Sequence, residues 1–186
     1  DPKDGYGQDL NHCVAELKLD AQQQVLFSTD KISMEQLAML YNMADCTINI
    51  SDAEGFGLAT LESLSCGTPI LVNMTGGLQE QVTDGKSMFG IGLQPDSRAV
   101  IGSQEVPFIY EDRLNGKKVA SALRNMYSLD PETRQIMGRS GREHVIKNYN
   151  FETFNNTWVD ILRELHETEG SWETRKYKNY RLLEVA

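Results

Sequence analysis

The chain has 186 residues, of which 40% are hydrophobic and 24% charged, and its formal net charge is -9. This length fits one domain with a substantial core. The acidic balance argues against nonspecific binding of nucleic acid or anionic lipid, since both need a positive field. No apolar run approaches the roughly 20 residues of a membrane span, so we expect a soluble protein and leave association with a membrane surface open.

The cysteines and histidines bear on the compartment and on metals. The chain has an odd number of cysteines, and none of them are in CxxC spacing: Cys13, Cys46 and Cys66. This favours buried, reduced thiols in a cytoplasmic protein. The three histidines form no metal-binding pattern, and we expect no metal site. The first residue is Asp1 and no targeting segment follows it, so we expect a fragment of a longer chain.

The first predicted elements alternate between helix and strand. Apolar residues at helical spacing predict a helix over 7–19, and the apolar run at 25–27 predicts a short buried strand. Ser33 and Gln36 have the spacing of a capping box, which predicts the start of a second helix. The β-branched run at 46–50 then predicts another strand.

A glycine-rich turn at 55–57 follows, and a helix is expected to begin near Leu58. The continuously apolar run at 69–72 predicts the next strand. Helices and strands that alternate with short connections are typical of a parallel sheet flanked by helices. The sequence therefore predicts an α/β fold.

The second half is less regular at its start. Glycines and prolines interrupt residues 84–112, which predicts a short strand or two and a long surface loop. A helix is expected over 119–127, and Asp130 with Pro131 marks the start of another.

The segment 150–167 is the clearest amphipathic helix, and we expect its apolar stripe to lie in the core. The stripe consists of Phe151, Phe154, Trp158, Ile161, Leu162 and Leu165. The tail at 170–186 is locally basic, through Arg175, Lys176, Lys178 and Arg181. It either docks on an acidic surface of the same protein or ends as a frayed terminus.

Two acids flank the glycine-rich turn, Glu54 before it and Glu62 inside the expected helix. In doubly wound sheets ligands bind beyond the carboxyl ends of strands, and free N–H groups at a helix N-terminus favour phosphate. Ionised carboxylates accept hydrogen bonds from sugar hydroxyls. A nucleotide-sugar satisfies all three features, with its diphosphate at the turn and one acid at each end.

A structural role for the acids must be weighed against this. Glu54 near a helix N-terminus stabilises the helix dipole, but Glu62 lies too far along. No Lys or Arg stands three or four residues from Glu62, which excludes a local ion pair. Since no basic residue lies between Lys31 and Lys86, the cations for a diphosphate must come from these lysines or from sequence outside this chain.

These residues carry a family resemblance. The segment from Glu54 to Val72 resembles the E-x7-E segment of the retaining, group 1 (family 4) glycosyltransferases of GT-B architecture; it reads EGFGLATLESLSCGTPILV. The segments LYNMADCTINISDAEGFG before it and GGLQE after it match the same family, from about Val25 to Val82. Weaker similarity reaches the terminal helices through MGRSGREHV and NYNFETF.

The resemblance implies that residues 1–169 are most of a Rossmann-like donor-binding domain, the C-terminal half of a GT-B fold without its first strands. Glu54 would be the catalytic residue, positioning the transferred sugar, and Glu62 would hold the ribose. The loop at 28–33 would place Lys31 and Ile32 at the nucleobase. The residues implied to face the sugar and diphosphate are Gly55, Phe56, Gly57, Leu58 and Ala59 through their backbone amides, and Thr60 through its hydroxyl.

The sequence also departs from the family. Asp30 stands where the family usually has glycine. The Arg and Lys that neutralise the diphosphate in the family, and the whole acceptor-binding first domain, do not appear in these residues. The expected partners are a nucleotide-sugar donor, an unknown acceptor and that missing domain, with no metal or cofactor. We expect this chain to be inactive by itself.

Two other functions fit part of the pattern. Glycoside hydrolases also use two carboxylates, which would make Glu54 and Glu62 an acid/base or nucleophile pair. A non-catalytic nucleotide-binding or interaction module would keep the fold and the turn without sugar transfer. The product released, or its absence, discriminates between these functions.

Overall fold

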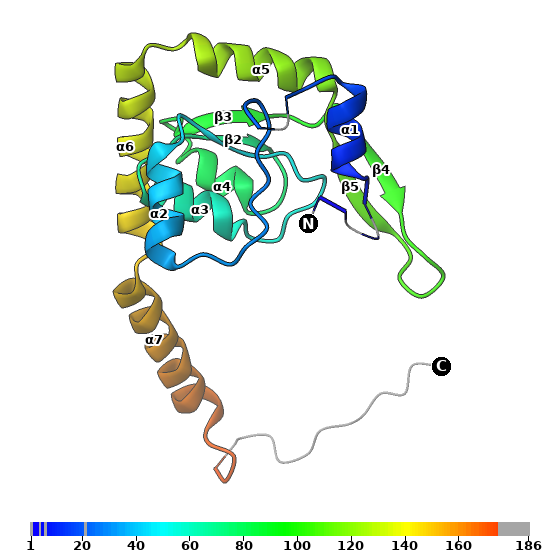
Figure 1. Cartoon of the computed structure of the whole chain (residues 1–186). Coiled ribbons are helices and arrows are strands. Elements are labelled where there is room, and N and C mark those ends of the chain that lie inside the picture. Colours follow the sequence, from blue (N-terminus) through cyan, green and yellow to red (C-terminus); the bar gives the residue numbers. More distant parts are fainter. Residues whose placement is uncertain (1, 4, 6, 21, 175–186) are drawn as a thin grey trace. The chain divides into compact units, whose positions relative to one another are not determined.

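A computed structural model describes residues 2, 3, 5, 7–20 and 22–174 of the chain. It divides into two compact units, one up to Leu37 and one from Ala38 onward. The elements of the described residues are, in chain order, α1 (Leu10–Glu16), α2 (Met34–Met43), β1 (Thr47–Asn49), α3 (Leu58–Ser65), β2 (Ile70–Asn73), α4 (Leu78–Val82), β3 (Gly90–Leu93), β4 (Ser97–Ile101), β5 (Ile109–Arg113), α5 (Gly116–Ser128), α6 (Pro131–Asn148) and α7 (Phe151–Glu169) (Figure 1).

The first unit holds α1 and the start of α2. The expected capping box is present, because the Ser33 amide donates to Gln36 Oε1 at 3.0 Å and the Gln36 amide donates to Ser33 Oγ at 3.3 Å. The expected strand at 25–27 is wrong. The described residues of this unit hold no strand for it to pair with, and the Leu26 side chain is 78% exposed. An unpaired strand leaves its backbone without the hydrogen bonds that stabilise it.

A parallel sheet with the order β1-β2-β3 forms the centre of the second unit, as expected. Thr47 pairs with Ile70, and Ile70 pairs with Gly90. All four residues of β2 are buried, since this strand has a neighbour on each side and helices over both faces. This explains why residues 69–72 form an uninterrupted apolar run.

Helices cover both faces of the sheet. Val72 points to one face, where it packs with Leu64 of α3, Leu78 of α4 and Val145 of α6. Leu71 points to the other face, where it packs with Ala122 of α5 and with Leu93. Figure 1 shows α5 on one side of the strands and α3 with α4 on the other. Side chains that alternate between faces thus place Ile70 and Val72 in one core layer and Leu71 in the other.

The region 84–112 holds more regular structure than expected. It contains β3 and an antiparallel hairpin of β4 and β5, in which Ser97 pairs with Arg113 and Ile101 with Ile109. The expected long loop is divided among residues 84–89, the short connection 94–96 and the hairpin tip at 102–108. Glycines and prolines there mark a turn between paired strands, and the pairing of one strand with the next is invisible to local periodicity.

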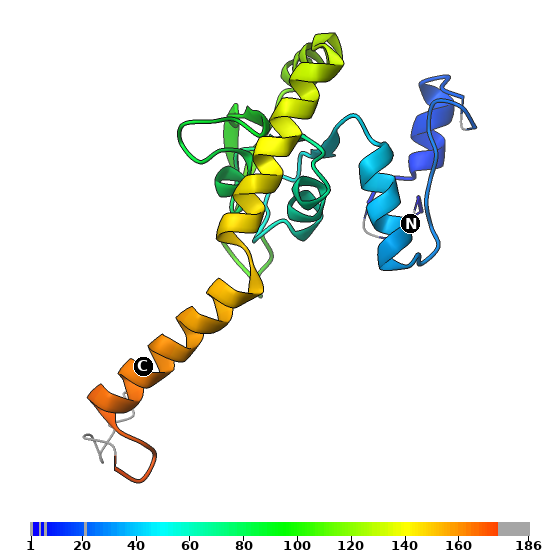
Figure 2. The same ribbon diagram turned by 90° about the vertical axis from the view of Figure 1, so that its left-hand side faces the viewer.

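The prediction that the apolar stripe of α7 lies in the core is wrong for this chain. No residue of α7 is buried, and the Phe151 side chain is 81% exposed. Figure 2 shows α7 extending away from the sheet and the helices that cover it. Its aromatic rings contact one another instead, with Phe154 6.3 Å from Trp158 between ring centroids. Periodicity shows that a face is apolar, but it does not show what covers it.

The starts of the later helices follow the sequence. The Asp130 side chain accepts a hydrogen bond from the Thr133 amide at 2.8 Å, and Pro131 takes the first position of α6 as predicted. None of the helices in the described residues combines the length and apolarity needed to cross a membrane. The basic residues of the tail lie outside the described residues.

Candidate functional site

The glycine-rich turn lies at the carboxyl edge of the sheet, between β1 and α3. Gly57 is the N-cap of α3 and has a φ of 87°, in the left-handed region that favours glycine. No side chain of the described residues caps α3, whereas α1, α5, α6 and α7 each start with an Asp or Asn cap. Gly55, Phe56, Leu58 and Ala59 are exposed. The first amides of α3 are therefore open to an anion.

A second glycine turn, at Gly76 and Gly77, packs against the first one. The Gly77 amide donates to the Gly55 carbonyl at 3.0 Å. A Cβ at Gly77 would lie 2.5 Å from the Phe56 carbonyl oxygen, and a Cβ at Gly76 would lie 1.6 Å from the Glu54 carbonyl oxygen. The two turns meet backbone against backbone, which only glycine permits at this distance.

Buried polar side chains fix the other side of the turn. Gln81 of α4 is fully buried, and its Nε2 donates to the Phe56 carbonyl at 2.6 Å. The Thr60 hydroxyl is also buried and hydrogen bonds with the Gly57 carbonyl and with Gln81 Oε1. The structure therefore places the Thr60 hydroxyl inside the protein, where it closes the first turn of α3.

Glu54 is half-buried, and one of its two carboxylate oxygens accepts a hydrogen bond. Asn49, the last residue of β1, donates from Nδ2 to Glu54 Oε2 at 3.2 Å. The Asn49 side chain is itself oriented, because its Oδ1 accepts from the amide and the hydroxyl of Ser51 at 3.1 and 2.7 Å. Ser51 thus orients the Asn49 side chain, and Asn49 in turn sets the direction of the Glu54 carboxylate.

Glu62 is held in the same manner from another helix. The Tyr41 hydroxyl donates to Glu62 Oε2 at 3.0 Å. Burial, and then the hydrogen bond to Glu62, raise the pKa of Tyr41 to about 12, so the hydroxyl keeps its proton at neutral pH. Among the described residues neither Glu54 nor Glu62 forms an ion pair. Each acid therefore stays available to a ligand through its second oxygen.

The remaining predicted residues, Lys31 and Ile32, lie in the first unit, on the loop before α2. Their approach to a nucleobase beside Glu62 stays a prediction.

The base of the β4–β5 hairpin joins this edge of the sheet, which the sequence did not indicate. The Asp112 amide donates to the Asp52 carbonyl at 2.7 Å, and the Asp112 carboxylate accepts from the Thr75 hydroxyl at 2.9 Å. Arg113 forms an ion pair with Asp52 at 3.0 Å, and Arg98 forms one with Asp112 at 3.0 Å. Both arginines face acids, so they add little free positive charge for a diphosphate.

We expect the attachment of the hairpin to weaken in acid. Hydrogen bonds from Arg98 and then Thr75 hold the pKa of Asp112 below its usual value. A depressed folded pKa gives stability that is present above the unfolded pKa, near 3.9, and lost as the pH falls through the folded pKa. Asp112→Asn should therefore lower the melting temperature at pH 7 more than at pH 3, measured by thermal unfolding.

The control for this comparison is Glu105→Gln at the exposed hairpin tip, which should change neither value. An equal deficit of Asp112→Asn at both pH values would contradict the role of its charge.

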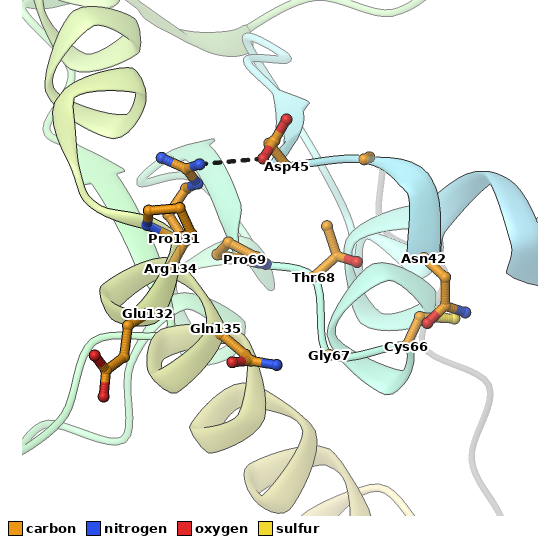
Figure 3. Close-up of a pocket in the computed structure, with 11 residues that line it drawn as sticks. Asn42, Asp45, Cys66, Gly67, Thr68, Pro69, Pro131, Glu132, Arg134 and Gln135 are labelled. Atoms are coloured by element: carbon orange, nitrogen blue, oxygen red, sulfur yellow. Dashed lines mark hydrogen bonds and ion pairs between the residues drawn. The ribbon is translucent and has the colours of Figure 1, made fainter.

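A pocket of about 720 Å³ lies at the opposite edge of the sheet and is distinct from this site. Its lining includes Asp45 before β1, Pro69 before β2 and Pro131 at the start of α6. Figure 3 shows Arg134 directed at Asp45, and the two side chains are 3.2 Å apart. Since Asp45 and Pro69 precede their parallel strands, this pocket faces away from the glycine turn.

Comparison with known proteins places the chain in a family. Residues 5–144 match the family described as glycosyl transferases group 1. The chain is 36% identical over 163 residues to a D-inositol 3-phosphate glycosyltransferase of Corynebacterium urealyticum, covering 87% of this chain and 33% of the relative. It is 30% identical over 109 residues to the enzyme so named in Paenarthrobacter aurescens, covering 59% of this chain and 22% of that protein.

Solved structures share the fold of this chain. Sucrose-phosphate synthase from Thermosynechococcus elongatus is 25% identical with a TM-score of 0.66, over 89% of this chain and 37% of its own. HepE from Anabaena, in complex with UDP and glucose, is 18% identical with a TM-score of 0.64, over 84% and 36%. The C-terminal domain of LpcC, a group 1 family protein from Francisella tularensis, is 21% identical with a TM-score of 0.56, over 77% and 62%.

The parallel sheet, its flanking helices and the turn at its carboxyl edge define the C-terminal half of a GT-B fold. The chain belongs to the group 1 glycosyl transferases. It spans about a third of the length of the Corynebacterium urealyticum relative and of sucrose-phosphate synthase.

Proposed function

We propose that this chain is the donor-binding part of a retaining glycosyltransferase, which moves a sugar from a nucleotide diphosphate-sugar to an acceptor. The observation that carries the proposal is the exposed, uncapped start of α3, with Glu54 and Glu62 each held through one oxygen by an uncharged donor. The complete protein would be active, and this chain alone inactive.

In this proposal each group binds one part of the donor. The diphosphate would lie at the start of α3, where the amides of Leu58 and Ala59 and the helix dipole favour negative charge. Glu54, before the turn, would accept hydrogen bonds from the transferred sugar. Glu62 lies five residues into α3, roughly 7 Å from the helix start at about 1.5 Å per residue, a reach that suits the ribose.

Catalysis would come from positioning and from charge. As the bond to the diphosphate breaks, negative charge grows on the leaving oxygen, and preorganised amides stabilise that charge without reorganising. Glu54 then orients the sugar rather than attacking it, and the proposal requires neither an enzyme nucleophile nor a metal. Further cations for the diphosphate would come from the part of the protein outside this chain, together with the acceptor site.

The choice of donor is tested on the complete protein. UDP-glucose is the first candidate, because HepE is solved with it. When labelled UDP-, GDP- and ADP-sugars are supplied, the sugar of one of these donors should be transferred to an acceptor, or that donor should be hydrolysed slowly. Free sugar released from a glycoside without any nucleotide would favour the hydrolase alternative. Neither transfer nor hydrolysis would favour a non-catalytic nucleotide-binding or interaction module.

We expect Glu62→Ala to weaken binding of the nucleoside diphosphate by about 1.5 to 3 kcal/mol, the range for hydrogen bonds to a charged group. Isothermal titration calorimetry on the complete protein measures this change. Glu105→Ala at the hairpin tip removes the same charge from an exposed position and should leave the affinity unchanged. Equal affinity of the Glu62 variant and the wild type would contradict the ribose role.

A further inference from the structure

The hydrogen bond between Tyr41 and Glu62 joins two helices that are separate in the sequence. Tyr41 belongs to α2 and Glu62 to α3, and the two residues are 21 positions apart. Among the described residues the Tyr41 hydroxyl is the single polar partner of the Glu62 carboxylate. The direction of this carboxylate therefore depends on where Tyr41 is held.

Tyr41 is held from its backbone as well as by its ring. The hydroxyl of Thr68, a buried residue just before β2, donates to the Tyr41 carbonyl at 2.6 Å. This bond connects the last turn of α2 to the segment that leads into the central strand. The ring is half-buried, so the hydroxyl reaches Glu62 from a fixed direction.

Only one oxygen of Glu62 is used by this contact. The Tyr41 hydroxyl is a donor at neutral pH, and it fixes Oε2 while Oε1 has no partner among the described residues. A side chain fixed in one rotamer loses less conformational entropy when a ligand binds. Asn49 likewise donates a hydrogen bond to one oxygen of Glu54, so each of the two acids of the site is held by one uncharged donor.

We propose that Tyr41 is a positioning residue for the nucleotide ribose, because its hydroxyl holds Glu62 so that the free carboxylate oxygen meets the ribose hydroxyls. This inference rests on the proposed donor-binding function. It predicts that the contribution of Tyr41 disappears when either the ribose hydroxyls or the Glu62 carboxylate is removed. A purely structural tyrosine would contribute equally in both cases.

The test compares Tyr41→Phe with the wild type in the complete protein, by calorimetry with UDP and with 2′,3′-dideoxy-UDP. GDP or ADP and their dideoxy forms replace these probes if the transfer assay selects another base. We expect Tyr41→Phe to weaken UDP binding about five- to tenfold, the scale of one ordinary intramolecular hydrogen bond, because the hydroxyl acts through Glu62 and does not itself touch the ribose. Binding of dideoxy-UDP should be equal in both proteins, and the donor KM should rise more than kcat falls.

A double-mutant cycle and a control substitution at another tyrosine complete the test. In a Glu62→Ala background, Tyr41→Phe should have no further effect on UDP affinity. Tyr127→Phe removes a hydroxyl from a residue that is 88% exposed, and this variant should bind UDP as the wild type does. Unchanged UDP affinity of Tyr41→Phe, or an equal loss for both probes, overturns the inference while the donor function stands. Failure of the wild type to bind any of the nucleoside diphosphates overturns both.

Discussion

Replacing Glu54 by glutamine in the complete protein is expected to lower turnover by about 100-fold, a scale that misplacement of the reacting groups can reach. The affinity for the nucleoside diphosphate should change by less than about threefold, because the sugar and not the nucleotide meets Glu54 in the proposed complex. Glutamine keeps the size of the side chain and an acceptor oxygen for Asn49 Nδ2, so the turn stays in place. Steady-state kinetics and calorimetry measure the two effects separately.

Glu132→Gln is the control for this substitution. Glu132 lies in the first turn of α6 and lines the pocket of Figure 3, at the sheet edge opposite to the glycine turn. Its loss should change neither turnover nor affinity. Equal losses of turnover and nucleotide affinity in Glu54→Gln would undermine the assignment of Glu54 to the sugar.

The sequence predicted those parts of the fold that local patterns determine. Strand β2 follows the apolar run at 69–72 and is buried, the Ser33 and Gln36 pair caps α2, and Asp130 with Pro131 starts α6. Each of these features depends on residues within a few positions of one another. The parallel arrangement followed from the short connections between alternating elements.

The errors share one physical cause, which is that strand pairing and helix burial depend on other segments of the chain and not on the local pattern. The run at 25–27 has strand-like residues but no neighbouring strand, while β4 and β5 form because each supplies the hydrogen bonds of the other. The stripe of α7 has helical periodicity, yet its burial depends on a surface that periodicity does not specify.

The candidate site shows the same division. The glycine turn and the two acids are contiguous in sequence, and the family resemblance of that segment points to them directly. The groups that orient the acids are Asn49 and Tyr41, and Tyr41 lies 21 residues from its partner. A single sequence carries no signal for such a contact. The glycines of GGLQE match the family, but their close approach to the Glu54 carbonyl is again a contact between separate segments.

This close approach predicts a large effect for Gly76→Ala. Gly76 has a φ of 49°, and a Cβ there would lie 1.6 Å from the Glu54 carbonyl oxygen, far inside van der Waals contact. Either the turn that carries Glu54 moves or the second glycine turn does, and both are backbone. We expect a loss of about 3 to 5 kcal/mol, from the left-handed conformation and the overpacking together. The melting temperature should fall by roughly 10 °C, and sugar transfer should be lost with the position of Glu54.

Gly85→Ala separates the two causes of this loss. Gly85 also has a left-handed backbone, with a φ of 84°, but a Cβ there meets nothing within 4 Å. It should cost only the conformational strain, about 1 to 2 kcal/mol, and leave transfer activity intact. The difference between the two variants in thermal unfolding therefore measures the contact between the glycine turns. If both variants unfold at the same temperature and both retain transfer, the two turns do not pack against each other in solution, and the support proposed for Glu54 is absent.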